Sequence, residues 1–474
     1  MYKRLLFLIT LTAAYTVSIA QDQWDLKECI DYALANNTSI KQYDIQSKIS
    51  ELQLKQSKLS QYPNVTFNGG PSFNSGRNQD PTSFSLITQS YLSANLQLQS
   101  SVEIFNWYSK QNTIAANKWE YEAAKASTDK LKDDIALTIA NSYLQILLAK
   151  EQEKIASVQL EQTQSQLSNT RKLVNAGSLP ELNAAELEAQ VALDSSTVIS
   201  ARGNVQQAML TLKAYMALDA ATPFEVELPP IALIPVENIG DLQPESVYTL
   251  AIANLPQQRV NDFKIKAAEK NIAAARGNMY PTLSAFANLA TGFNSRAQEI
   301  IGISTNTFPV AKVNVGGTDY NVFPLQPQYD YSKTVFGKQL NENFRQGIGL
   351  NVSVPIFTGG TLRTTWERSK FTAKNLEFQK EADNQKLKQD IYQAYNAAMV
   401  ALQKFNATQK MVATAQRSNE FAQKRYGVGM LTTLELITNQ NNLLRAKLEL
   451  VQNQIDYVFK MKVLEFYKGQ GLKL

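Results

Sequence analysis

The sequence predicts a mainly α-helical protein that also carries a membrane β-sheet, with long coiled-coil hairpins and four strands in each chain. Three observations carry this prediction. The chain starts with the pattern of an export signal, two proline-free stretches repeat apolar residues every seven positions, and four segments alternate apolar and polar residues. A seven-residue apolar period is typical of left-handed coiled coils, and strict alternation is typical of a two-faced sheet.

The first twenty residues have the pattern of a secretory signal peptide. Two basic residues, Lys3 and Arg4, precede an apolar run, and small residues end the segment at Ala20. We expect cleavage of residues 1–20 before Gln21. The alternative is an uncleaved membrane anchor, which the short run interrupted by threonines disfavours. Because Gln21 is not a cysteine, this signal gives no reason to expect a lipid anchor.

Composition argues against most enzyme classes. The 474-residue chain contains no histidine and one cysteine, Cys29, which excludes a Ser-His-Asp triad, a zinc site of the Cys/His kind and an internal disulfide. The net charge of +5, from 47 basic and 42 acidic residues, is too small and too evenly spread to indicate nucleic-acid binding. We expect no catalytic site, no cofactor and no metal site.

The mature chain has the pattern of a duplication. Residues early in the first copy match residues of the second copy at one constant sequence separation, as Ala33 matches Ala251. Later residues match at a larger separation, as Gly177 matches Gly429. Because the offset grows along the chain, the second copy must contain an insertion. Two blocks in the same order with one insertion indicate repeated structural units.

The duplication divides the chain into regions. We expect a first structural repeat at residues 21–222, a proline-rich linker at 223–244 and a second repeat at 245–474. The insertion, at about residues 295–341, is rich in Gly, Asn, Gln and Tyr and lies between two strands of one hairpin. We expect it to be a loop that faces the outside of the cell and serves as a cover.

Each repeat is expected to contain a first helix, a strand pair, a very long helix, a tight turn and a long return helix. The first helix of the chain is predicted over about residues 26–61. Residues 108–174 contain no proline or glycine and would form a helix on the order of 100 Å long. The second copy repeats this stretch over about 362–426. Heptads are clearest in the return helices, over 184–212 and 436–464.

The strand segments have one apolar and one polar face. Leu96 and Leu98 lie on the apolar face of one segment, and Ile348 and Leu350 repeat that face in the second copy. We expect these four residues to face lipid. Four strands cannot close a barrel, so a barrel would be shared between chains, with eight strands from two chains or twelve from three. A soluble sandwich is the alternative, which helices of this length disfavour.

Three motifs carry a family resemblance. They are the opening segment 24–37 (WDLKECIDYALANN), the strand-to-helix junction 354–360 (VPIFTGG), and the tip segment 425–429 (RYGVG) followed by 434–436 (LEL). In these motifs, their order and their duplication, the chain resembles the TolC family of outer-membrane efflux proteins. The resemblance covers essentially all of the mature chain.

The resemblance implies a homotrimer with a twelve-stranded barrel in outer-membrane lipid, continued by an α-helical coiled-coil tunnel in the periplasm. It also implies a passive exit duct for small molecules or polypeptide, reached from an inner-membrane pump through a periplasmic adaptor protein. The first copy departs from the family junction: Glu103 replaces the proline, and Trp107 and Tyr108 replace the paired glycines.

Two tight turns separate the long helices. The local interpretation is a helix end capped by glycine, which adopts the left-handed conformation without penalty. The resemblance implies that these tips also contact the adaptor, and residues 428–430 are similar to the Val-Gly-Leu tip of the family. The residues of the two tips are Ala176, Gly177, Ser178 and Leu179 in the first copy and Val428, Gly429, Met430 and Leu431 in the second.

Two acidic residues follow the tips. Glu435 lies six residues after the second tip glycine, and Glu186 lies nine after the first. The local interpretation is a solvated helix face, as for most surface glutamates. The resemblance implies a ring of carboxylates that closes the periplasmic end of the pore, with Glu435 at one of its positions. Thr438 occupies the other position and cannot carry a charge.

A rival interpretation is a periplasmic coiled-coil adaptor or scaffold without a membrane barrel, because adaptors also use helical hairpins. The strand alternation, combined with an export signal, favours the duct, since an adaptor does not need such strands. The polar wall expected for the tunnel is too generic to identify a cargo or a pump.

Overall fold

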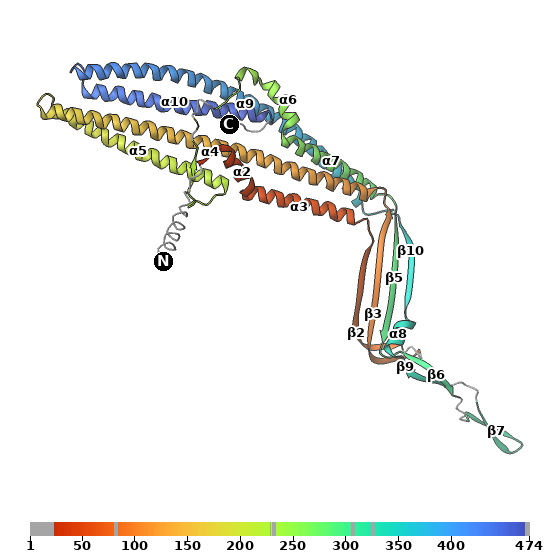
Figure 1. Cartoon of the computed structure of the whole chain (residues 1–474). Coiled ribbons are helices and arrows are strands. Elements are labelled where there is room, and N and C mark those ends of the chain that lie inside the picture. Colours follow the sequence, from red (N-terminus) through yellow and green to blue (C-terminus); the bar gives the residue numbers. More distant parts are fainter. Residues whose placement is uncertain are drawn as a thin grey trace, which may run out of the picture. The chain divides into compact units, whose positions relative to one another are not determined.

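The structure is a computed structural model that describes residues 23–79, 84–227, 229, 234–304, 309–323 and 328–469. The expected signal peptide at residues 1–20 lies outside this part of the chain, as does part of the expected linker. The chain divides into two compact units, whose elements are labelled in Figure 1. The helical unit comprises three segments: the one up to Leu52, Lys118–Ala267, and the one from Thr372 onward. The sheet unit comprises Gln53–Asn117 and Ala268–Phe371.

Two antiparallel helical hairpins dominate the helical unit (Figure 1). The first is α4 (Ser109–Asn175) with α5 (Glu181–Met216), and the second is α9 (Thr361–Gly427) with α10 (Thr433–Tyr467). Helices α4 and α9 both have 67 residues, and their starts are related by the same offset as the two tip glycines. In the described part of the chain, no helix has an 18-residue stretch apolar enough to cross a membrane.

A hydrophobic cluster at the base of the first hairpin holds the chain ends of the first repeat together. It is built around Ile139 and Leu144 of α4 and Met216 of α5, which are almost completely buried. A short parallel pair, β1 (Gln23–Trp24) with β4 (Glu225–Val226), closes it. Cys29 is fully buried there, and burial raises the pKa of its thiol to about 12, so the thiol stays protonated.

The helix expected over residues 26–61 is two helices, α2 (Leu26–Asn36) and α3 (Thr38–Leu59), so the single-helix prediction is wrong at Asn37. The Asn37 side chain accepts a 2.8 Å bond from the Ser39 N–H and donates a 3.0 Å bond to the Tyr215 carbonyl oxygen. An asparagine side chain that bonds the backbone two residues further on competes with the helix and breaks it.

The second repeat has a break at the equivalent place. Helices α6 (Pro244–Asn254) and α7 (Pro256–Gly277) are separated at Leu255, which is related to Asn37 by the same offset that relates Ala251 to Ala33. Here Pro256 starts the new helix, because its missing N–H is tolerated in a first turn but not in a helix interior. Different residues therefore break the helix at the same point of each repeat.

The sheet unit is built on four antiparallel strands in the order β10-β5-β3-β2. They are β2 (Asn64–Gln79), β3 (Leu86–Phe105), β5 (Thr282–Asn294) and β10 (Arg345–Ser353). Strands β3 and β5 pair across the two repeats. Strands β2 and β10 form the two edges of this four-stranded sheet. The predicted mainly helical fold with a sheet of four long strands is confirmed.

The strand register places most apolar residues of the four strands on one face, and Phe286 of β5, opposite Gly349 and Ser101, is an exception on the other face. Leu98 lies opposite Leu289 on one side and Phe67 on the other. On the edge strand, Ile348 and Leu350 are 87% and 67% exposed, although both are apolar. The opposite face carries asparagine, glutamine and serine, for example Asn95, Gln97, Asn288 and Asn351. The unit thus exposes a continuous apolar face that nothing in one chain covers within the described residues.

Both strand-to-helix junctions use two consecutive residues in the left-handed conformation. In the second repeat these are Gly359 and Gly360, with φ of +60° and +80°. In the first repeat they are Trp107 and Tyr108, with φ of +53° and +61°. The left-handed conformation costs an L-residue about 1–2 kcal/mol, whereas glycine adopts it freely. The first junction therefore keeps the backbone conformation of the second in spite of its larger side chains.

The insertion, expected to be an external loop over about residues 295–341, contains strands and a short helix of its own among its described residues. Its position outside the cell stays a prediction. Strands β6 (Gln298–Ser304) and β9 (Gln328–Lys333) form one hairpin ladder, and β7 (Ala311–Val315) pairs with β8 (Thr318–Val322). A short helix, α8 (Phe336–Glu342), returns the chain to β10 and packs against β5. The alternation of tyrosine, valine and isoleucine with polar residues is the signal for these strands.

Gln339 of α8 ties the insertion to the sheet. It is 2% exposed, its Oε1 accepts the Asn294 N–H at 2.8 Å, and its Nε2 donates to the carbonyl oxygens of Asn294 and Thr334 at 3.0 and 2.8 Å. Buried backbone groups that lose their partner cost about 1–3 kcal/mol each. We therefore expect Gln339→Ala to loosen residues 295–341 and to accelerate their cleavage in limited proteolysis of the native protein.

The control for this variant is Asn341→Ala, on the exposed side of the same helix. It should leave the cleavage pattern unchanged, and cleavage outside the insertion should not change in either variant. Equal protection of the insertion in Gln339→Ala and in the unmodified protein would contradict the role given to Gln339.

Candidate functional site

The two hairpin tips have the same backbone structure. Helix α4 ends in a Schellman motif, in which the Gly177 N–H bonds the Val174 carbonyl oxygen at 2.8 Å and the Ser178 N–H bonds that of Leu173 at 2.9 Å. Gly177 has a φ of +76°, which only glycine adopts without strain.

Helix α9 ends in the same way at the equivalent place in the second repeat. The Gly429 N–H bonds the Tyr426 carbonyl oxygen at 3.0 Å, and the Met430 N–H bonds that of Arg425 at 2.8 Å. Gly429 has a φ of +75°. A side-chain nitrogen of Arg425 also donates to the Met430 carbonyl oxygen at 3.3 Å, which braces the second tip.

The surfaces of the two tips differ. Val428 and Met430 of the second tip are 70% and 67% exposed, although both are apolar. The residues of the first tip are smaller or polar: Ala176, Gly177 and Ser178 are exposed, and Leu179 and its counterpart Leu431 are half-buried. The second tip thus presents an apolar projection at the end of a long hairpin, whereas the first presents a small, polar one.

The return helices also start differently. Helix α5 begins after Pro180, which makes no side-chain capping bond. Helix α10 begins after Thr432 with a complete capping box: the Thr432 hydroxyl accepts the Glu435 N–H at 3.3 Å, and Glu435 Oε2 accepts the Thr432 N–H at 2.9 Å. The spacing Thr432-x-x-Glu435 is the sequence signal for this box, and it was missed by sequence reasoning.

Glu435 therefore has a local structural role. Its Oε2 also accepts the Thr432 hydroxyl at 2.8 Å, and its side chain is exposed. Hydrogen bonds from the Thr432 backbone N–H and hydroxyl, and then the charge of Arg425, hold the pKa of Glu435 below its ordinary value of 4.5. The carboxylate is thus ionised at neutral pH, as a charged ring position requires, and is held in a fixed orientation at the helix start.

The second predicted acid lies elsewhere on its helix. Glu186 is half-buried in the second turn of α5, three residues beyond Asn183, which is the counterpart of Glu435. The counterpart of Glu186 is Thr438, whose hydroxyl donates to the Leu434 carbonyl oxygen at 2.8 Å. The two glutamates therefore occupy different turns of the two return helices.

A seam of buried polar side chains runs through both hairpins above the tips. The Tyr426 hydroxyl of α9 lies 3.2 Å from that of Thr170 on α4 and 3.4 Å from that of Thr433 on α10. Such groups need partners because an unpaired buried polar group costs about 1–3 kcal/mol. Further pairs of this polar seam are Gln440 with Gln166 at 2.7 Å, Gln190 with Asn441 at 3.4 Å, and Thr163 with Asp194 at 2.7 Å.

The polar seam was also missed by sequence reasoning. Thr163 and Thr170 lie seven residues apart, each three residues after an apolar heptad position of α4, Leu160 or Leu167. Polar residues at inward heptad positions are the signal for a seam of this kind. Their partners on other helices follow only from the packing of the two hairpins.

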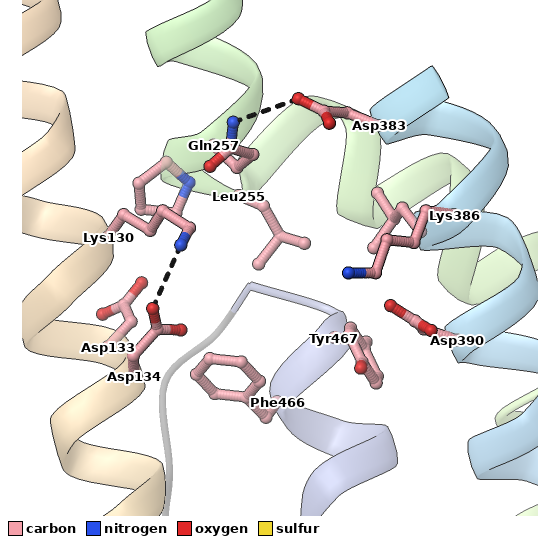
Figure 2. A pocket seen from close by; sticks show the side chains of 12 residues that line it. Lys130, Asp133, Asp134, Leu255, Gln257, Asp383, Lys386, Asp390, Phe466 and Tyr467 are labelled. Carbon is pink, nitrogen blue, oxygen red and sulfur yellow. Dashed lines mark hydrogen bonds and ion pairs between the residues drawn. The ribbon is translucent and has the colours of Figure 1, made fainter. Parts of the chain in front are cut away.

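A cavity of about 480 Å³ lies in the helical unit near the break between α6 and α7. Figure 2 shows that its side chains come from α4, the α6–α7 break, α9 and the end of α10. Lys130 bonds Asp134 at 3.2 Å, and Gln257 bonds Asp383 at 3.3 Å. Burial raises the pKa of Tyr467 there, and the charges of Asp390 and Asp134 raise it further.

The arrangement of this cavity is that of paired charges between packed helices. Burial, and then the neighbouring carboxylates Asp129 and Asp134, raise the pKa of Asp133 above its ordinary value. Within the described residues, no group of three or more His, Cys, Asp or Glu side chains is placed to hold a metal ion. The candidate surfaces of the described chain are the hairpin tips, where Val428 and Met430 are exposed, and the apolar sheet face.

Comparison with known proteins identifies the family. The family model described as "Outer membrane efflux protein" matches residues 29–218 and 247–465. The outer membrane efflux protein BepC of Brucella suis is 20% identical over 428 residues, which cover 90% of this chain and 81% of BepC. The outer membrane protein TolC of Escherichia coli is 23% identical over 380 residues, 78% of this chain and 68% of TolC.

Solved structures share the fold. The structure of CusC has a TM-score of 0.75 at 17% identity and covers 94% of this chain and 92% of its own. The outer membrane protein VceC of Vibrio cholerae has a TM-score of 0.71 at 16% identity, with 94% of this chain and 97% of that one covered.

These similarities decide between the two interpretations left open by the sequence. The curated relatives named above are outer-membrane proteins, not periplasmic adaptors. The matched family segments contain the first hairpin, the second hairpin except for the last two residues of α10, and all four strands of the sheet. The chain therefore belongs to the outer membrane efflux protein family, and it is an outer-membrane exit duct with a TolC-like fold.

Proposed function

We propose that the chain assembles as a homotrimer, in which three four-stranded sheets close one twelve-stranded barrel and the helical hairpins continue it as a periplasmic tunnel. The observation that carries this proposal is the sheet with two edge strands, β2 and β10. In a bilayer every backbone polar group needs a partner, so an open sheet edge is not tolerated there.

The strand directions suit closure by further copies. Each neighbouring pair in the order β10-β5-β3-β2 is antiparallel, so the two edge strands run in opposite directions. Strand β10 of one copy placed beside β2 of the next continues the antiparallel alternation. Strand β10 has nine residues, and a membrane-spanning strand needs roughly 9–11. Twelve strands leave a water-filled bore, whereas eight are filled by side chains.

In this assembly Leu96, Leu98, Ile348 and Leu350 face outer-membrane lipid, and the polar face of the sheet lines the bore. The tips bind a periplasmic adaptor, mainly through Val428 and Met430, whose exposure supports this role. The adaptor connects the duct to an inner-membrane pump. The duct is passive: it carries small molecules or polypeptide to the outside and has no catalytic step.

The assembly is tested by particle mass in detergent. We expect the mass of three chains. Leu350→Arg should prevent trimer formation, because a charge on the lipid face at mid-membrane costs about 2–4 kcal/mol per site and the trimer has three such sites. The matched control is Asn351→Arg, on the opposite face of the same strand, which should still give trimers. A stable monomer, or equal effects of the two variants, would show that the shared barrel is wrong.

The adaptor contact is tested at two positions related by the duplication. Met430→Asp should weaken binding to the adaptor roughly tenfold or more, because burying a methionine side chain contributes about 1.5–3 kcal/mol. Ser178→Asp, the equivalent change at the first tip, should have a smaller effect. Site-specific cross-linking in the native cell measures both, with the amount of trimer as the control. Undiminished cross-linking in Met430→Asp would remove this residue from the docking surface.

The acidic ring is tested by separating the charge of Glu435 from its capping role. Glu435→Gln preserves a capping box, since glutamine serves at this position, but removes the charge. We expect weaker cation selectivity and weaker block by multivalent cations from the periplasmic side in planar-bilayer conductance, with intact trimers. Glu186→Gln should act in the same direction but less strongly. Wild-type selectivity and block in both variants would make these glutamates ordinary surface residues.

The pH dependence of Glu435 provides the control for the cap. Because its folded-state pKa is lowered, the stabilisation from the cap is fully present above about pH 4.5 and is lost as the pH falls through the lowered pKa. Glu435→Ala, which removes both cap and charge, should lack this loss below pH 4.5 and should loosen the start of α10 at neutral pH. Hydrogen exchange of residues 433–436 measures it.

A further inference from the structure

We propose that the side chains of Trp107 and Tyr108 form an aromatic anchor at the membrane interface. This anchor holds the helix-side end of the sheet unit at the headgroup and upper acyl region of the bilayer. This proposal rests on the proposed function, in which the apolar sheet face meets lipid. Its starting point is the left-handed backbone of these two residues, with φ of +53° and +61°. Conformations this unfavourable for large residues cluster at functional sites.

The duplication shows that the backbone does not require these side chains. The equivalent junction of the second repeat has the same conformation at Gly359 and Gly360, where glycine adopts it without strain. A tryptophan and a tyrosine at the first junction raise the free energy of the folded backbone. Their side chains must therefore contribute something that glycine cannot.

Contacts within the chain cover only part of the surface of the Trp107 and Tyr108 side chains. The Trp107 ring lies 4.9 Å from Tyr280 and 5.3 Å from Phe105, and its Nε1 donates a 2.8 Å bond to the Pro281 carbonyl oxygen. These contacts fix the orientation of the ring. Trp107 is still 44% exposed and Tyr108 is 63% exposed. A fixed, half-exposed aromatic surface of this kind is suited to an external contact.

The position of the cluster identifies that contact. Phe105 lies opposite Leu283, which lies opposite Val352, so Phe105 is at the end of the apolar sheet face. Trp107 and Tyr108 continue this face where the strands give way to the helices. Aromatic rings at the ends of an apolar band are typical of the membrane–water interface, where an apolar body and a polar end are both accommodated.

Basic side chains beside the cluster fit the same occupant. Lys58 in the last turn of α3 and Arg276 in the last turn of α7 are exposed. Both helices end against this junction: the Lys110 Nζ donates to the Ser60 carbonyl oxygen at 2.8 Å, and a β-carbon on Gly277 would meet the Trp107 carbonyl oxygen at 3.0 Å. Cations at this level can meet lipid phosphates while their stems cover apolar surface.

The anchor is tested by tryptophan fluorescence of the trimer in vesicles of brominated phosphatidylcholine. The emission that is lost in Trp107→Phe reports Trp107 alone, and this variant keeps an aromatic ring at the junction. We expect bromines near the headgroup to quench that emission more than bromines near the chain ends. Leu98→Trp in the Trp107→Phe background is the depth control, and bromines deep in the chains should quench it.

A second variant removes the anchor without disturbing the backbone. Trp107→Gly combined with Tyr108→Gly reproduces the glycine pair of the second junction. It should assemble as trimers in detergent like the unmodified protein but insert into vesicles several-fold more slowly. Trp366→Phe, a change outside the anchor in the same unit, should insert at the unmodified rate.

The outcomes separate this proposal from the proposed function. If Leu98→Trp is quenched but the Trp107 emission is not, the sheet faces lipid and the anchor is wrong; another protein surface then covers these rings. If neither is quenched, the sheet is not in lipid and the proposed function itself fails. Insertion of the glycine variant at the unmodified rate would also overturn the anchor.

Discussion

The open edges of the four-stranded sheet are the constraint on which the rest of the molecule depends. Strands β2 and β10 leave backbone donors and acceptors along both edges, and most apolar side chains of the sheet lie on one exposed face. Water can hydrogen-bond the backbone groups of the edge strands, but exposing the apolar face to water is unfavourable. Lipid accommodates the apolar face, but it cannot hydrogen-bond the edge strands. Further copies of the same sheet, closed into a ring in lipid, resolve both requirements at once.

The helical hairpins meet a different requirement, which is a fixed register over a great length. A seam of apolar heptads permits sliding by a whole repeat, because each heptad resembles the next. The polar seam introduces pairs that form in one register only, such as Tyr426 with Thr170 and Thr163 with Asp194. Buried polar groups of this kind contribute little net stability, and setting the register is their best-attested role. Because the tips end these helices, the seam also positions the tips.

The two repeats share a backbone but differ in chemistry at their ends. Both long helices have 67 residues, both tips are Schellman motifs, and both junctions use a left-handed pair. At these same places the side chains of the two repeats differ. The first repeat has Trp107, Ser178 and Asn183 where the second has Gly359, Met430 and Glu435. The shared backbone conformation preserves the architecture, while the variable side chains give each end of each repeat its own surface. In the proposed assembly, the aromatic anchor lies in the first repeat, whereas the main adaptor contact and the charge of Glu435 lie in the second.

Local periodicity by itself determined the long helices, the strand faces and the tip glycines. The expected helix over 108–174 differs by one residue from Ser109–Asn175, because heptads and the absence of proline and glycine are local signals. Tertiary structure alone decided what depends on distant partners. The strand order and its two edges, the break at Asn37 with its bond to Tyr215, and the polar seam each join segments far apart in the chain. Periodicity states which face of an element is buried, but not which element will cover it.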